Sequence, residues 1–354
     1  MAIRVPAQFP RGGKVRLAFV GEAPSNEELR IGQPLVGADG RIFNQLLRTA
    51  NIERDTCLIT NVFDMKLPDN EVAHWCAPMD VARKEGFADL PPVGKVGYLK
   101  PEHRHHLERL QTEIERASPD VIVPLGPTAL WAFTGYSNIG GYRGNIVEAK
   151  YLVPGAKLLP TFHPSFVRQT WKYFTVVSGD FEKAMSESHL HGSRIVLPHR
   201  ELWLEPTLAD LEAFTPFIMS SDLLSVDIET GWGMITCIGF APSAERAIVV
   251  PLVDLRQPNK SYWATPAEEL EAMGHIRAWL DNPIPKVGQN FGGYDFLWLL
   301  QKYGLRPRNM AEDTRLMHHA RYAELDKSLE FMGASYTAQG AWKQMGRRTE
   351  KRDD

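Results

Sequence analysis

The chain has 354 residues and a formal net charge of −3, and 44% of its residues are hydrophobic and 23% charged. This composition is typical of a soluble globular protein with about two domains, and the charge counts weakly against a tight, non-specific nucleic-acid binder that depends on phosphate contacts. No apolar run approaches the ~20 residues that cross a membrane, and the N-terminus lacks the apolar core of a signal peptide, so we expect a cytoplasmic protein without a membrane partner.

The first half of the chain alternates short apolar segments with amphipathic ones. Apolar segments predict strands at residues 16–20, 57–63, 120–124 and 157–161, and helical spacing of apolar residues predicts helices at 41–50, 101–117 and 174–185. Strands that alternate with helices favour a largely parallel α/β sheet covered on both faces.

A second α/β pattern follows a join at about residues 185–210. Its predicted strands are residues 223–228, 235–240, 247–252 and 286–289, the second and third as antiparallel neighbours, and its predicted helices are 268–280 and a segment from 292. We therefore predict two α/β domains, residues 1–190 and 191–354. The charged tail at residues 343–354 is expected to fray.

Polar side chains stand at the ends of the first set of strands. Glu22 follows the first predicted strand, Asn61 lies near the end of the second, and His163 follows the fourth. Because ligands bind beyond the carboxyl ends of strands in an open parallel sheet, we expect this carboxylate, amide and imidazole to meet in one cleft. Each residue alone is more typical of a turn or a helix cap, whereas together they favour a functional site.

Four segments resemble, in the same order, the motifs of the family-four uracil-DNA glycosylases. They are GEAPSNEELRIGQPLVGADGRIFNQLL (21–47), TNVF (60–63), VIVPLGPTAL (121–130) and FHPS (162–165). The resemblance covers roughly residues 16–185. It implies a parallel-sheet α/β/α domain that binds DNA, flips a uracil out of the base stack and breaks its glycosidic bond.

The resemblance also implies roles for individual residues. The Asn61 amide can donate to uracil O4 and accept from N3–H, His163 can donate to O2 where negative charge develops, and Glu22 orients water or stabilises the cationic sugar. Other implied substrate contacts are Gly21, Leu35, Ser165, Phe166 as a wedge, and Arg168 with Lys172 as phosphate ligands.

Two positions depart from this family. Leu35 stands where the family has a phenylalanine that stacks on uracil, and Met65 stands where it has one cysteine of an iron–sulfur cluster. Three cysteines, Cys57, Cys76 and Cys237, cannot supply four thiolates, so we expect no iron–sulfur cluster. In this respect the segment is more similar to the glycosylase-like domains at the front of certain phage A-family DNA polymerases.

The second half contains paired carboxylates. Asp227 and Glu229 are separated by one residue on a predicted strand, so both point to one face, and Asp295 lies near a predicted helix start. The segments VDIET (226–230) and NFGGYD (290–295) resemble two motifs of the DEDD 3′–5′ exonucleases, which have a ribonuclease-H-like (DnaQ-like) fold. The alternative for Asp-Ile-Glu alone is a strand end with two solvated acids.

The exonuclease resemblance implies a metal site. Asp227, Glu229 and Asp295 would be catalytic and hold Mg²⁺ or Mn²⁺, with Asn290 and Tyr294 as substrate contacts. The third motif, Tyr-x-x-x-Asp, is missing; Tyr322 and Asp326 have its spacing but precede its expected place, which we interpret as coincidence. The predicted exonuclease fold is therefore incomplete at its C-terminus.

These motif sets predict a DNA-processing enzyme of phage-type replication or repair, located in the cytoplasm, that of a bacterial host if a phage encodes it. It would combine uracil excision with 3′–5′ proofreading-type cleavage, with DNA as partner and a polymerase domain or subunit supplied downstream. The alternative is a non-catalytic DNA-binding piece of a split or truncated phage polymerase. Five histidines are expected to be solvated or capping, because no cysteine or acid stands at metal spacing: His103, His105, His106, His318 and His319.

Overall fold

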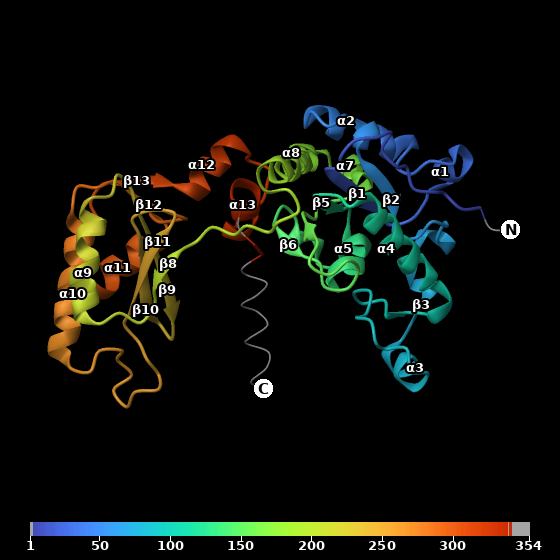
Figure 1. Ribbon diagram of the computed structural model, residues 1–354. Coiled ribbons are helices and arrows are strands. Elements are labelled where there is room, and N and C mark those ends of the chain that lie inside the picture. The colour runs from blue at the N-terminus through green and yellow to red at the C-terminus, as the bar shows by residue number, and fades with distance from the viewer. Residues whose placement is uncertain (1–2, 339, 342–354) are drawn as a thin grey trace. The chain divides into compact units, whose positions relative to one another are not determined.

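A computed structural model describes residues 3–338, 340 and 341, and it divides the chain into two compact units (Figure 1). The first unit contains the described residues up to Leu197 together with those from Glu330 onward, and the second contains Pro198–Leu329. Both units combine one main sheet with helices, which confirms the predicted α/β class. The tail at residues 343–354 lies outside the described residues.

The first unit is built on a five-stranded sheet with the order β2-β1-β5-β7-β6. The pairs β2–β1, β1–β5 and β5–β7 are parallel and only the β6–β7 pair is antiparallel, so the predicted parallel sheet is confirmed, with an unpredicted antiparallel edge. The strands are β1 (Leu17–Gly21), β2 (Leu58–Asn61), β5 (Val121–Pro124), β6 (Val147–Glu148) and β7 (Lys157–Leu158), and a separate pair is β3 (Cys76–Ala77) with β4 (Tyr98–Leu99).

Helices cover both faces of this sheet because its central strands are apolar on both sides. Leu17 and Phe19 of β1 belong to the hydrophobic cluster that contains the buried residues of α2 and α8, whereas Ala18 and Val20 belong to the cluster of α4 and α5. The helices of the unit are α1 (Asn26–Ile31), α2 (Gly37–Thr49), α3 (Met79–Lys84), α4 (His105–Ala117), α5 (Pro127–Thr134), α6 (Ile139–Tyr142), α7 (Pro164–Gln169), α8 (Phe174–His191) and α13 (Leu329–Tyr336).

The division of the chain differs from the predicted domains 1–190 and 191–354. The first unit extends to Leu197 and also includes the segment from Glu330. Two positively charged side chains of the unit, Arg143 and Lys183, donate hydrogen bonds to that segment. Arg143 Nη2 donates to Ser335 Oγ at 2.8 Å, and Lys183 Nζ donates to the Ala334 carbonyl at 3.2 Å. Such long-range contacts leave no periodic signal in the sequence.

The second unit has a six-stranded mixed sheet with the order β13-β12-β9-β10-β11-β8. The predicted antiparallel pairing of the second and third strands is confirmed for β10 and β11, and β9 also pairs with β10 in antiparallel fashion. The strands are β8 (Glu201–Trp203), β9 (Leu224–Gly231), β10 (Met234–Ala241), β11 (Arg246–Pro251), β12 (Lys286–Gly288) and β13 (Met310–Asp313); the helices are α9 (Leu208–Met219), α10 (Pro266–Asp281), α11 (Asp295–Tyr303) and α12 (Thr314–Arg321).

Candidate active site

Four loops of the first unit meet at the carboxyl edge of its sheet. Gly21 and Asn61 are register partners at the ends of the parallel strands β1 and β2, so the loops after them start side by side. Leu125, after β5, forms a parallel bridge with Thr161, which lies two residues before His163. The sheet topology therefore brings together the loops that the sequence analysis predicted to converge.

A cleft of about 530 Å³ opens between these loops. Four of the predicted site residues line it: Glu22, Leu35, His163 and Ser165. Glu28 and Asp39 also line the cleft; both lie within the motif at residues 21–47, although the sequence analysis assigned no role to either. Their acidic side chains come from α1 and α2, the two helices that follow β1.

The side-chain tips of Asn61 and His163 lie over the α-carbon of Gly21. A β-carbon built on Gly21 would lie 2.3 Å from Asn61 Oδ1 and 3.6 Å from His163 Nε2. Residue 21 must therefore lack a side chain for the Asn61 amide to occupy its position. Asn61 is only 4% exposed, so its amide has little room to move elsewhere.

The hydrogen bonds of His163 define its tautomer. The Ser165 backbone N–H donates to Nδ1 at 3.2 Å, and since a backbone amide can only donate, Nδ1 must be the unprotonated nitrogen. Burial lowers the pKa of His163 to about 4, against the opposing influence of Asp39. At neutral pH the ring is therefore neutral, with its proton on Nε2, the nitrogen that lies over Gly21.

Glu22 also lines the cleft, and Thr128 Oγ1 of α5 donates a hydrogen bond to its Oε2. Burial raises the pKa of this carboxyl, and the bond from Thr128 partly offsets the effect. A carboxylate that is partly desolvated and held by one donor interacts strongly with a cation that forms nearby.

The loop that carries Leu35 is held from both sides. Leu35 has a left-handed backbone with φ of 49°, and its N–H donates to the buried Glu28 carboxylate. Arg54 donates to the carbonyl oxygens of Pro34 at 2.7 Å and Leu35 at 3.1 Å. Residue 35 is thus presented to the cleft by a rigid turn.

Phe166, Arg168 and Lys172 lie on and after α7 at the edge of this site. Phe166 is 36% exposed, and its ring lies 5.1 Å from that of Tyr173. Arg168 Nε donates to Asp39 Oδ1 at 2.7 Å, while Lys172 Nζ lies 5.4 Å from the Tyr173 ring centroid. The wedge and phosphate-binding roles of these residues stay predictions.

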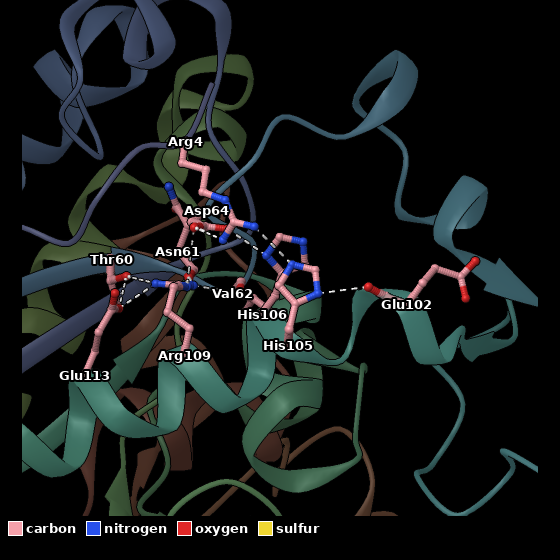
Figure 2. A network of polar contacts seen from close by, with 10 residues as sticks. All are labelled: Arg4, Thr60, Asn61, Val62, Asp64, Glu102, His105, His106, Arg109 and Glu113. Carbon is pink, nitrogen blue, oxygen red and sulfur yellow. Dashed lines mark hydrogen bonds and ion pairs between the residues drawn. The ribbon is translucent and has the colours of Figure 1, made fainter. Parts of the chain in front are cut away.

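His106 is not solvated, contrary to our expectation. It is 1% exposed, and its Nδ1 lies 2.7 Å from Asp64 Oδ1 in a polar network that also contains Asn61 and Arg109 (Figure 2). The sequence analysis found no acid partner because Asp64 is 42 residues away. His318 is also buried, at 4% exposure, while His105 and His319 are exposed.

The cysteines do not fit an iron–sulfur cluster. Cys57 and Cys76 are buried and are the two cysteines of the first unit, whereas a cluster takes four thiolates. Cys237 belongs to the other unit, and Met65 packs against the hydrophobic core. In the part of the chain that the structure describes, no group of three His, Cys, Asp or Glu side chains is arranged to hold a metal ion.

Of the three carboxylates predicted in the second unit, two lie together on an exposed strand face and the third is buried. Asp227 and Glu229 share the exposed face of β9, as the alternation predicted. Asp295 starts α11 but is buried, and its Oδ1 accepts from the Ile228 N–H at 3.0 Å. Burial, together with the charges of Asp227 and Asp313, raises the pKa of Asp295 to about 6. As arranged, these three acids do not form a metal site.

Asn290 and Tyr294 lie on the loop before α11. The Asn290 N–H donates to Asp313 Oδ1 at 3.1 Å, and Asn290 borders a cavity of about 400 Å³ with Arg315 and Lys327. The Tyr294 hydroxyl hydrogen-bonds with Thr230 Oγ1 at 2.6 Å. Their predicted contacts with a substrate stay predictions.

Comparison with known proteins identifies the first unit. Residues 9–185 match the uracil DNA glycosylase superfamily, and the chain belongs to that superfamily. It is 33% identical over 175 residues to a type-4 uracil-DNA glycosylase of Thermotoga maritima, covering 48% of this chain and 77% of that protein. A type-4 uracil-DNA glycosylase of Sulfurisphaera tokodaii is 28% identical over 176 residues, covering 48% and 69% respectively.

Among solved structures, the chain is similar to the EXD2 exonuclease domain soaked in Mg and GMP. The match has 19% identity and a TM-score of 0.26, and it covers 38% of this chain and 67% of that one. In the described residues, no helix is both long and apolar enough to span a membrane.

Proposed function

We propose that the first unit excises uracil from DNA. The observation that carries this proposal is the convergence of the Asn61 amide and the His163 Nε2–H over the side-chain-free Gly21. An extrahelical base could enter the cleft of about 530 Å³ beside them. The relatives to which the chain is similar are named type-4 uracil-DNA glycosylases, which supports uracil as the base.

Asn61 and His163 divide recognition and catalysis between them. The amide donates to uracil O4 and accepts from N3–H, a pattern that cytosine cannot offer. The neutral imidazole donates from Nε2 to O2, where negative charge develops as the glycosidic bond breaks. Glu22 stabilises the cationic sugar or orients the water that attacks it.

The test uses the full chain and oligonucleotides that contain one uracil or one cytosine. We expect release of uracil but not of cytosine. Asn61→Asp should weaken the uracil preference, because a carboxylate cannot donate to O4. Asn51→Asp makes the same chemical change at an exposed position after α2 and should leave the preference intact. Unchanged selectivity in the Asn61 variant would refute the assignment.

A second candidate function, 3′–5′ exonucleolytic cleavage, concerns the second unit. Two observations favour cleavage by this unit. Asp227 and Glu229 lie on one face of β9, and the charge of Asp227 contributes to the raised pKa of Asp295. Asp313 is a poor fourth ligand, because its Oδ1 already accepts from the N–H groups of Asn290, Arg315 and Leu316. The site would therefore need rearrangement or another carboxylate before it could hold Mg²⁺ or Mn²⁺ in pairs.

Titration with Mn²⁺ and digestion of a labelled single strand test this second function. We expect weak binding and slow cleavage by the chain alone, and loss of both in Asp227→Ala. Fast cleavage that survives Asp227→Ala would contradict the assignment of the carboxylates.

The setting we propose is phage-type DNA replication or repair, in the cytoplasm, with a polymerase domain or subunit as partner. The rival is a non-catalytic module that only binds DNA. If uracil-containing DNA is bound in preference to undamaged DNA but never cleaved, the rival is correct.

A further inference from the structure

Arg109 of α4 donates a hydrogen bond to the backbone of Asn61 at the end of β2, the residue proposed to bind the base (Figure 2). Its Nη2 donates to the backbone carbonyl of Asn61 at 2.6 Å and to that of Val62 at 3.0 Å. The strand β2 is the outermost strand of the five-stranded sheet, and on its outer edge Gln8 forms an antiparallel bridge with Ile59. Beyond this bridge, Arg109 supplies the donors for the carbonyls of Asn61 and Val62.

We propose that Arg109 is a positioning residue for Asn61 and sets the uracil selectivity of the first unit; this inference rests on the proposed function. In the described residues its hydrogen-bond partners are Thr60, Asn61, Val62 and Glu113, none of which lines the cleft. Its influence therefore reaches the base through the end of β2 that carries Asn61.

Arg109 is itself held in a defined orientation. Its Nη1 donates to Glu113 Oε2 at 2.6 Å, one turn along α4, and to Thr60 Oγ1 at 3.2 Å. Thr60 completes the triangle by donating to the same Glu113 oxygen at 2.7 Å. A planar guanidinium with fixed donors is suited to hold several acceptors at once, which an ammonium group does with less geometric precision.

Asp64 connects Arg109 to two further side chains of the network, Arg4 and His106. It accepts from Arg4 Nη1 at 3.1 Å and lies 2.7 Å from His106 Nδ1, while Arg109 Nε lies 4.0 Å from its Oδ2. Burial would raise the pKa of Asp64, but the bond with His106 and the charges of Arg109 and Arg4 outweigh it and lower the pKa to about 2. The carboxylate stays charged, so α4, the N-terminal segment and the loop after β2 are held together.

Loss of Arg109 would therefore release the base-reading amide. The carbonyls of Asn61 and Val62 would lose a charged donor, and buried acceptors without partners favour local rearrangement. A displacement of ~1 Å in a site of this kind can lower a rate by on the order of 100-fold. Selectivity depends on the amide more than general DNA binding does, because cytosine and uracil differ at the edge that Asn61 reads.

The experiment measures binding to two single-stranded oligonucleotides by fluorescence anisotropy, and it uses the full chain. One oligonucleotide carries 2′-fluoroarabino-uridine, whose fluorine slows bond cleavage, and the other carries 2′-fluoroarabino-cytidine at the same position. Arg109→Met removes all donors, and Arg109→Lys keeps the positive charge beside Glu113. Arg116→Met is the matched control, since Arg116 also lies on α4 but stacks on Phe9 at 4.4 Å.

We expect the uracil preference to fall by about tenfold or more in Arg109→Met and by a smaller factor in Arg109→Lys, with cytosine-strand affinity unchanged. Arg116→Met should keep the wild-type preference. If the wild-type chain prefers uracil and Arg109→Lys keeps the full preference, the positioning role is wrong, and this holds even if Arg109→Met fails to fold. If the wild-type chain shows no preference, the proposed function itself fails and the inference falls with it.

Discussion

Substitution of Gly21 by alanine tests the geometry of the cleft most directly. The new β-carbon would lie 2.3 Å from Asn61 Oδ1, whereas ordinary contact begins at 3.4 Å, so the amide must retreat by about 1 Å. The backbone of Asn61 cannot follow, because β1 and β2 pair in parallel and Arg109 holds its carbonyl. A retreat of ~1 Å is expected to lower uracil excision by on the order of 100-fold, equivalent to about 2.7 kcal/mol of transition-state stabilisation.

Single-turnover release of uracil from a labelled oligonucleotide is the assay. Gly179→Ala is the matched control, since a β-carbon at this position in α8 meets nothing within 4 Å and alanine favours a helix over glycine. We expect the control to excise at the wild-type rate and to be slightly more stable. If folded Gly21→Ala excises within about threefold of the wild-type rate, the reasoning from the Asn61 position is refuted.

Leu35→Phe should raise uracil excision by about one to two orders of magnitude, because base–aromatic stacking contributes ~1–3 kcal/mol. The turn already presents residue 35 to the cleft. If the folded variant excises uracil only at the background rate, the absence of stacking is not what limits excision. Asp64→Asn should lower the free energy of unfolding of the first unit at pH 7 by on the order of 2 kcal/mol. The pKa of Asp64 is lowered from 3.8 to about 2 in the folded state, so its stabilisation is complete above pH 3.8 and is lost as pH falls through 2. Urea unfolding at pH 7 and near pH 2 should therefore show a difference between wild type and variant that shrinks in acid, and a constant difference would contradict the charge-based account.

The polar residues at the carboxyl edge of the first sheet can be placed from the sequence because they obey a local rule. In a parallel sheet the carboxyl ends of the strands fall at one edge, so Glu22, Asn61 and His163 could be placed there from their positions after predicted strands. Glu22 and His163 line the cleft, whereas Asn61 lies over Gly21 beside it. The same reasoning placed Asp227 and Glu229 on one face of β9, since side chains alternate along any strand.

The sequence by itself thus determined the α/β class, the parallel first sheet and the polar residues at its edge. Tertiary structure alone decided which distant groups hold those residues in place. Arg109 lies 48 residues from Asn61, His106 lies 42 from Asp64, and Ser335 lies 192 from Arg143. Periodicity reports only which face of an element is buried, whereas a hydrogen bond between side chains on different elements depends on how those elements pack. For the same reason, burial of Asp295 against Ile228 could not be predicted from its place beside a helix start.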